Sequence, residues 1–161
     1  LALLLPCIPR LRRLQTVVEL RRFLHRVPML ADLTRTTLDD LALHLRLENA
    51  PDNTTIVRQN DVGDTLYLIK SGEAMVLATN DHGIEVEVAV LHAMDYFGEI
   101  ALLRDVPRTA TVRARGPVQL FSLTRADFQK ILVRSEEFRE TVAKRGDARY
   151  LETQCTLLAL R

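Results

Sequence analysis

The stretch that decides the fold is Phe97–Val112, "FGEIALLRDVPRTATV", in which a short apolar segment is followed closely by Pro-Arg-Thr. Phe97 is expected to end a strand, and Glu99 to open a helix of about one and a half turns that runs through Leu103. Gly98 allows a ligand to come close to the backbone. The first turn of such a helix has backbone amides without intrahelical partners, and these amides attract an anion.

The side chains around this short helix indicate a ligand that carries both a phosphate and a hydroxyl group. The amides of Ile100, Ala101 and Leu102 are expected to face the phosphate, and the small side chain of Ala101 lets it approach. Arg108 has a planar guanidinium that suits two phosphate oxygens, and Thr109 adds a hydroxyl beside it. Glu99 would repel a phosphate, so we expect it to accept a hydrogen bond from a sugar hydroxyl. A 3′,5′-cyclic nucleotide meets both requirements.

The same stretch resembles the phosphate-binding cassette of the cyclic nucleotide-binding domain family, in "FGEIALL" followed by "PRTATV". The segment "GDTLYLIKSGEAMV" is similar to a strand pair of that family, with Gly63, Gly72 and Glu73 in place. The resemblance extends over about residues 23–155. It implies a regulatory domain that binds a cyclic nucleotide and signals its occupancy to a fused effector.

The resemblance also implies a role for each residue of the cassette. Glu99 would hold the ribose 2′-hydroxyl, and Arg108 the cyclic phosphate with Thr109 beside it. The backbone around Gly98, Ile100 and Ala101 would complete the phosphate site. The implied ligand is cAMP or cGMP, with no further cofactor. In the family a threonine after the cassette arginine often accompanies cGMP tolerance, so the sequence leaves both nucleotides open.

Strand-like runs and turn residues alternate between about residues 46 and 124. The runs include "DTLYLIKSGEAMVLA", "IEVEVAVL" and "VQLFSLT", and the turn signals include "SGE", "NDHG" and "RGP". Five of the six glycines lie between Gly63 and Gly116. We therefore expect an α+β, mainly β fold, with an eight-stranded jelly-roll β-barrel over about 46–124. N-terminal helices, the short cassette helix and C-terminal helices over about 125–160 would accompany it.

Helical periodicity on both sides of the barrel predicts the remaining elements. Residues 10–26 and 29–45 predict two N-terminal helices, the second capped by Thr36 or Thr37. "RADFQKIL" predicts a helix of about two turns after the barrel. Ser135 is expected to begin a longer helix that Gly146 interrupts.

We expect this last helix to close over the base of the nucleotide. Its Arg149 or Tyr150 would stack on the exposed face of a purine. The other face would lie against apolar barrel side chains, for which the candidates are Val76, Val86 and Val88. Movement of the helix would then report occupancy to the fused domain.

The N-terminal residues leave two interpretations open. "LALLLPCIP" is far shorter than the roughly 20 apolar residues that span a bilayer, and arginines follow it, as they do on the cytoplasmic side of a span. Residues 1–22 are therefore either a basic helix that packs on its own domain or a membrane-proximal linker. Residues 23–161 form the expected cyclic nucleotide-binding domain. A linker of this kind favours a membrane transporter or channel as the effector.

Charge and cysteine usage restrict the class of protein. Residues 10–26 carry six arginines and one glutamate. Residues 46–105 carry four basic and eleven acidic side chains, and residues 106–161 carry eleven basic and six acidic ones. An acidic centre between basic ends suits a barrel with helical arms better than a nucleic-acid groove, so no nucleic-acid partner is expected. Cys7 and Cys155 show no metal or CxxC spacing, which indicates a reduced, cytoplasmic protein. A membrane-proximal linker would place it at the inner face of a membrane.

Other classes of function are weaker. The four histidines (His25, His44, His82 and His92) are scattered without an HxH pair, so neither a cupin-type metal site nor an enzyme is expected. A barrel that binds nothing remains an alternative, although such relatives usually lose the glutamate or the arginine. The chain stops at Arg161, before any helix-turn-helix of the kind in relatives resembling the catabolite activator. The sensor of a transcription regulator and a homo-oligomer both stay open.

Overall fold

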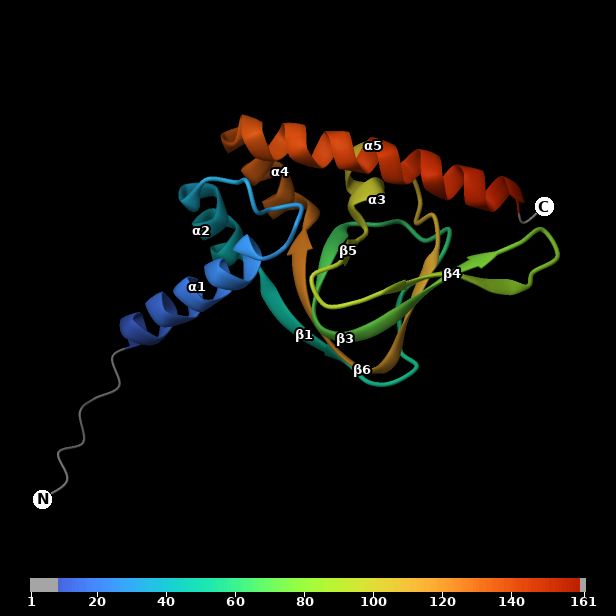
Figure 1. Ribbon diagram of the computed structural model, residues 1–161, viewed down its shortest axis with the longest axis horizontal. Helices are drawn as coiled ribbons and strands as arrows, with labels where there is room; N and C mark the ends of the chain where they lie inside the picture. The colour runs from blue at the N-terminus through green and yellow to red at the C-terminus, as the bar shows by residue number, and fades with distance from the viewer. Residues whose placement is uncertain (1–8, 160–161) are drawn as a thin grey trace, which may run out of the picture.

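A curved antiparallel sheet with helices at one end and along one side forms the structure, a computed structural model that describes residues 9–159 (Figure 1). Two helices come first, and three more follow or interrupt the strands. In chain order the elements are α1 (Pro9–His25), α2 (Arg35–His44), β1 (Arg46–Ala50), β2 (Thr55–Val57), β3 (Thr65–Thr79), β4 (Glu85–Leu91), β5 (Tyr96–Phe97), α3 (Glu99–Arg104), β6 (Thr111–Thr124), α4 (Arg125–Arg134) and α5 (Glu136–Ala159).

The described strands form one sheet in the order β1-β6-β3-β4, with β2 also on β6 and β5 on β3. All pairings are antiparallel. β3 and β6 are 15 and 14 residues long and pair along most of their length. The sheet curls around an apolar interior, as Figure 1 shows. This interior includes Ile69, Ala74, Leu91, Phe97, Val112, Ala114, Val118 and Leu120.

The expected class, a mainly β jelly-roll fold with helices, is confirmed, but the expected eight strands are six in the described residues. The turn signals "SGE" and "RGP" bend the chain without ending a strand. β3 runs through Gly72, whose φ is +92°, and the register against β6 shifts between Ile69 and Glu73. A glycine at positive φ inside a paired strand makes a local bend while the ladder resumes on either side. Each long strand therefore replaces two of the predicted ones.

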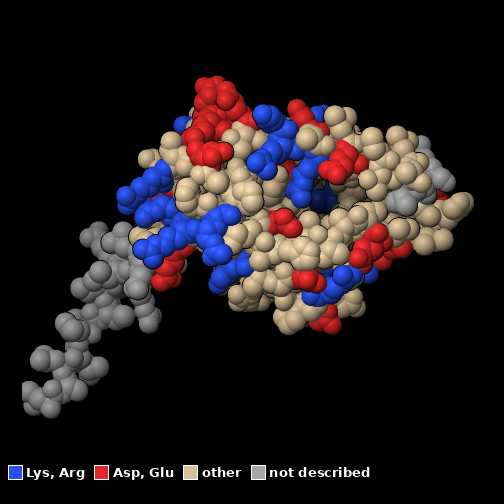
Figure 2. All heavy atoms as spheres, viewed as in Figure 1, with Lys and Arg blue, Asp and Glu red and all other residues tan. Residues whose placement is uncertain are grey.

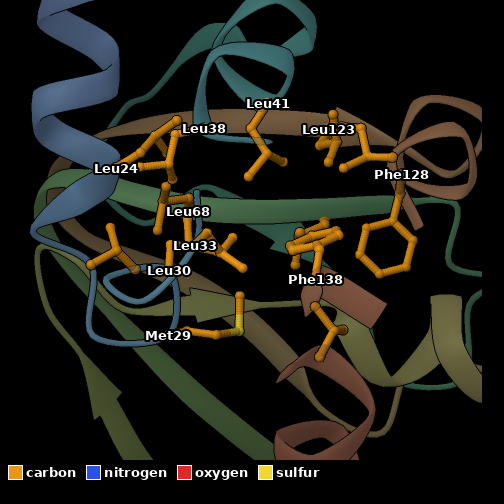
Figure 3. Close-up of a cluster of buried hydrophobic side chains, with 14 of the residues drawn as sticks. Leu24, Met29, Leu30, Leu33, Leu38, Leu41, Leu68, Leu123, Phe128 and Phe138 are labelled. Atoms are coloured by element: carbon orange, nitrogen blue, oxygen red, sulfur yellow. The ribbon is translucent and has the colours of Figure 1, made fainter. Parts of the chain in front are cut away.

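The helices pack on one end of the sheet through a second apolar cluster (Figure 3). The rings of Phe128 on α4 and Phe138 on α5 meet edge to face, with centroids 5.7 Å apart. Side chains from α1, α2, β3 and β6 complete the cluster. It includes Leu24, Met29, Leu30, Leu33, Leu38, Leu41, Leu68, Leu123, Phe128 and Phe138.

Two of the predicted helix starts can be compared with the cap geometry. The prediction that Thr36 or Thr37 caps α2 is wrong, because Thr34 has the extended cap conformation and its side chain accepts a hydrogen bond from the Thr37 amide. The helix therefore begins directly after Thr34, at Arg35, which is earlier than predicted. The start predicted at Ser135 is confirmed, since its hydroxyl accepts a hydrogen bond from the Phe138 amide at 3.1 Å.

The predicted interruption at Gly146 is also wrong, because α5 is one continuous helix of 24 residues. Its first half buries Phe138 and Val142 in the helical cluster. Its second half extends past the cluster and over the open side of the curled sheet (Figure 1). We call residues 147–156 of α5 the covering segment.

α1 continues without a break past residue 22 and packs on α2, where Arg21 pairs with Asp39 at 2.8 Å. Leu24 at its end is fully buried. The apolar stretch that raised the possibility of a membrane-proximal linker, residues 1–8, lies outside the described residues. Within the described part of the chain, no helix combines the length and apolar character that a membrane span requires.

Candidate functional site

A cavity of about 230 Å³ lies beneath the covering segment of α5. Figure 2 shows the molecule hollowed below α5, with basic side-chain atoms visible inside the recess. Three parts of the chain surround the cavity: the sheet, the segment around α3, and the inner face of α5. The apolar wall comes from Val57, Val76, Ala78, Val88, Ala89, Leu91 and Val112.

The short helix α3 is placed at the cavity by the residue that precedes it. Gly98 caps the helix in a left-handed conformation, with φ +91°, which a residue with a side chain rarely adopts. No side chain caps the first turn. Glu99, Ile100 and Ala101 are buried and line the cavity. The predicted helix after Phe97 is thus confirmed, and its uncapped first turn lies in the wall of the cavity.

Arg108 is buried, with 6% of its surface exposed, and also lines the cavity. Its guanidinium donates hydrogen bonds to the carbonyl oxygens of Gly98 at 3.1 Å and Thr65 at 2.8 Å. The guanidinium fits because two glycines, Gly63 and Gly98, leave room for it. A Cβ atom on Gly63 would lie 2.6 Å from Nε of Arg108, and one on Gly98 would lie 2.5 Å from Nη1. Arg108 therefore ties the start of β3 to the cap of α3.

Glu99 is 2% exposed, and its carboxylate meets the covering segment of α5. Arg149 donates to Oε1 of Glu99 at 3.0 Å and to the carbonyl oxygen of Tyr96 at 2.7 Å. The same guanidinium lies over the Tyr96 ring, 4.3 Å from its centroid. Arg149 thus links α5 to the end of β5 and to the first residue of α3.

Burial and charge together determine the electrostatics of the site. Burial lowers the pKa of Arg108, with neighbouring acidic groups acting in the opposite direction. Burial also lowers the pKa of Arg149, but the combined effects of Glu99, Tyr96 and Asp95 outweigh it, so the pKa is raised overall. Burial raises the pKa of the Tyr96 phenol, which keeps it neutral. Both guanidinium groups stay charged at neutral pH.

The two cations differ in their partners. Arg149 is neutralised by Glu99, whereas within the described residues no carboxylate forms an ion pair with Arg108. Its hydrogen bonds to two carbonyls leave further N–H donors of the guanidinium unused. A buried positive charge with spare donors on a cavity wall favours an anionic ligand.

Most of the residues predicted from the sequence meet at this cavity. Its lining includes Gly98, Glu99, Ile100, Ala101, Arg108, Thr109, Val88 and Arg149, together with Val76. Tyr150 and Val86 are not among the lining residues. The Tyr150 ring packs under the guanidinium of Arg104, 4.5 Å from its centroid, on the side of α5 that faces α3. Val86 lies beyond the shift in the β3–β4 register, farther along the hairpin.

The sequence reasoning missed three polar residues of α5 that line the cavity: Glu152, Thr153 and Thr156. With Arg149 they follow the i, i+3, i+4, i+7 spacing of one helix face, which could have identified them. The Thr153 hydroxyl donates to the carbonyl of Arg149, and that of Thr156 to the carbonyl of Glu152. Their oxygens therefore remain available as acceptors. Nowhere in residues 9–159 do three or more metal-ligating side chains gather into a candidate metal site.

Comparisons with known proteins agree with this geometry. The chain is 37% identical over 110 residues to a cAMP-dependent protein kinase regulatory subunit of Blastocladiella emersonii, which covers 68% of this chain and 27% of that protein. It is 38% identical over 118 residues to a cyclic nucleotide-gated potassium channel of Rhizobium etli, and this match covers 73% of this chain and 32% of the channel. The chain thus corresponds to about a quarter to a third of these relatives.

A solved structure and a family model add to these similarities. The regulatory domain of Toxoplasma gondii PKA, crystallised with cAMP, superposes with a TM-score of 0.77 at 28% identity, covering 84% of this chain and 51% of that one. The family model described as the cyclic nucleotide-binding domain matches residues 47–135, more than half of the chain. The chain therefore belongs to the cyclic nucleotide-binding domain family.

Proposed function

We propose that residues 23–161 form a regulatory, non-catalytic domain that binds a 3′,5′-cyclic nucleotide, cAMP or cGMP, in the cavity beneath α5. One observation carries the proposal. One cavity combines a buried carboxylate, Glu99, with a buried guanidinium, Arg108, that pairs with no carboxylate of residues 9–159, against an otherwise largely apolar wall. These three features match a sugar hydroxyl, a phosphate and a base.

In the proposed complex each part of the ligand has its own contacts. The phosphate accepts hydrogen bonds from the spare donors of Arg108 and from the first turn of α3. The ribose 2′-hydroxyl donates to Glu99, and the base lies against Val76 and Val88. A cavity of about 230 Å³ is below the usual range of about 300–1,000 Å³ for ligand pockets, which favours a compact mononucleotide over a dinucleotide.

We propose that the site accepts cGMP as well as cAMP. Thr109 lines the cavity directly beside Arg108, so its hydroxyl is available to a base that carries a donor near the phosphate. Guanine has an exocyclic amino group that adenine lacks at that ring position. The similarity to proteins named for cAMP supports the adenine nucleotide as the first candidate.

We expect ligand binding in the cavity to affect the rest of the protein by changing the position of α5. Its first half is fixed in the helical cluster by Phe138 and Val142, while its covering segment contacts the cavity through Arg149. A ligand that binds better with the covering segment in place shifts α5 toward that position. The same helical cluster includes Leu24 at the end of α1, so α1 and α5 share one apolar cluster.

The proposed output is a fused effector outside residues 23–161. The relatives support this arrangement, because the matching region is a minor part of each of them. One of those relatives is named as a potassium channel, which supports a membrane transporter or channel as one candidate effector. Residues 1–22 would then be the connection. A kinase catalytic subunit bound in trans is the other candidate.

One observation favours a barrel that binds nothing. Both charged groups of the site already have partners within the protein, since Arg108 is bonded to two carbonyls and Glu99 to Arg149. Isothermal titration calorimetry with cAMP, cGMP and 5′-AMP decides between the two. We expect the cyclic nucleotides to bind and 5′-AMP, whose phosphate is open and doubly charged, to bind much more weakly. Absence of binding by both cyclic nucleotides would refute the sensor and leave the structural barrel.

A further inference from the structure

The cassette helix α3 crosses α5 at Gly146. This glycine is buried within a continuous helix, although glycine is among the least favourable residues for a helix interior. It follows Phe138 and Val142 on the face of α5 that packs on the protein, and it precedes Arg149 by one turn. A residue that weakens the helix at a buried position has a packing reason to be there.

That reason is Leu103, the second-last residue of α3. A Cβ atom built on Gly146 would overlap Cδ1 of Leu103, the only other nearby atom being Cγ of the same side chain at 3.8 Å. Leu103 is half-buried and packs against the helical cluster. The missing side chain of Gly146 is therefore a notch in α5, and the end of Leu103 occupies it.

Polar contacts flank this notch on the solvent side. Arg104 forms an ion pair with Asp147, and its guanidinium lies over the Tyr150 ring at 4.5 Å. The side chains of Arg104 and Asp147 are 39% and 64% exposed, so their pairing contributes little in water. The contact of Leu103 with Gly146 is the apolar part of the crossing, and it limits how closely the two helices can approach.

We propose that Leu103 and Gly146 form a joint that positions the covering segment of α5 over the cavity. Neither residue lines the cavity, so both act through Arg149 and Thr153, which lie one and two turns farther along α5. A methyl group at position 146 could be accommodated only if Leu103 left the notch or if α5 rose from α3. Either change removes the contact between the end of Leu103 and Gly146, which in this proposal supports the covering segment.

The ligand part of this inference rests on the proposed function, but the position of α5 does not. The test therefore uses two measurements on the chain of residues 1–161. Hydrogen exchange without ligand compares residues 147–156 with residues 136–142, and calorimetry measures binding of cAMP and cGMP. The variants are Gly146→Ala, Leu103→Ala, the double variant, and Lys144→Ala as the control on the exposed face of the same helix.

We expect Gly146→Ala to speed exchange in residues 147–156 and to weaken cyclic nucleotide binding, each by about five- to tenfold, as overpacking of a close contact does. Residues 136–142 should keep their protection, and Lys144→Ala should change neither measurement. The direction of the change in exchange rate distinguishes the joint from an effect of helix propensity, because the higher helix propensity of alanine alone would slow exchange. Leu103→Ala should also speed exchange in residues 147–156. In that background Gly146→Ala should cause no further increase, because the overlapping atom is gone.

Two results would overturn the joint. One is slower or unchanged exchange in Gly146→Ala, which would mean that Leu103 swings aside without consequence for α5. The other is fully additive effects in the double variant, which would mean that the two residues act separately. If the unaltered chain binds no cyclic nucleotide, the proposed function fails, and the exchange measurements still decide the joint.

Discussion

Replacing Arg108 with alanine should affect the protein both with and without ligand. In the ligand-free protein the variant removes the hydrogen bonds that the buried guanidinium donates to Gly98 and Thr65. Hydrogen bonds from a charged donor contribute about 1.5–3 kcal/mol each, or about 3–6 kcal/mol for two. Part of this is offset because a buried charge is no longer removed from water, a cost reflected in the lowered pKa of Arg108.

We therefore expect the free energy of unfolding to fall by about 2–3 kcal/mol, which for a chain of this size lowers the Tm by about 5–10 °C. Thermal unfolding followed by circular dichroism measures this change. Arg113→Ala is the matched control, since that guanidinium pairs with Glu85 on the surface and lies outside the cavity. Its loss should cost less than about 1 kcal/mol.

Binding provides the second half of the test. Loss of a charge-assisted phosphate contact should weaken cyclic nucleotide binding by about 3–4 kcal/mol, two to three orders of magnitude in Kd. Calorimetry well below the lowered Tm separates this effect from unfolding. An unchanged Kd would refute the role of Arg108 in binding, and an unchanged Tm would refute its role in holding β3 to α3.

Three further substitutions test other contacts of the site and the sheet. Glu99→Gln should weaken cyclic nucleotide binding by about 1–2 kcal/mol, and a 2′-deoxy ligand should then lose little more. Calorimetry in which the two losses add fully would exclude contact between Glu99 and the ribose. Arg149→Ala should lower the free energy of unfolding by about 2–4 kcal/mol, because it leaves the carboxylate of Glu99 buried without its cation. An unchanged Tm would mean that other groups satisfy Glu99. Gly72→Ala should cost about 1–3 kcal/mol, since the residue has φ +92° and its Cβ would overlap the carbonyl oxygen of Pro117. Gly83→Ala, at φ +77° with open space around it, should cost less in chemical denaturation, and an equal loss would contradict the predicted overlap.

Local patterns predicted the elements better than they predicted how the elements join. The helix after Phe97 and the start of α5 after Ser135 depend on residues close in sequence, and both are confirmed. The bends at "SGE" and "RGP" were predicted as strand ends because glycine allows either. Only the pairing of β3 with β6 on both sides of the bends keeps the strands continuous. That pairing is not visible in either segment alone.

The site residues show the same difference: those within one short segment were predicted better than the contacts between separate segments. The cassette from Gly98 to Thr109 could be predicted because its chemistry lies in one short segment. Arg149 or Tyr150 was predicted to face the base because either can stack on a purine, but adjacent helix residues point about 100° apart. Arg149 therefore reaches the cavity, while Tyr150 packs on Arg104. The place of Gly146 depends on Leu103 of a different helix, so the sequence suggested an interruption where the structure has a contact.

If the proposed function holds, different residues of the site determine affinity and signalling. A ligand shifts α5 only to the extent that it binds one placement of α5 better than another. Contacts of a bound nucleotide with Arg108 and Thr109 would form whether or not α5 covers the cavity, so they would raise affinity for both placements alike. Contacts with Arg149, Glu152, Thr153 and Thr156 exist only when the covering segment is in place. Under the proposed function, the phosphate therefore supplies affinity, and the part of the nucleotide that reaches α5 determines how far the helix responds.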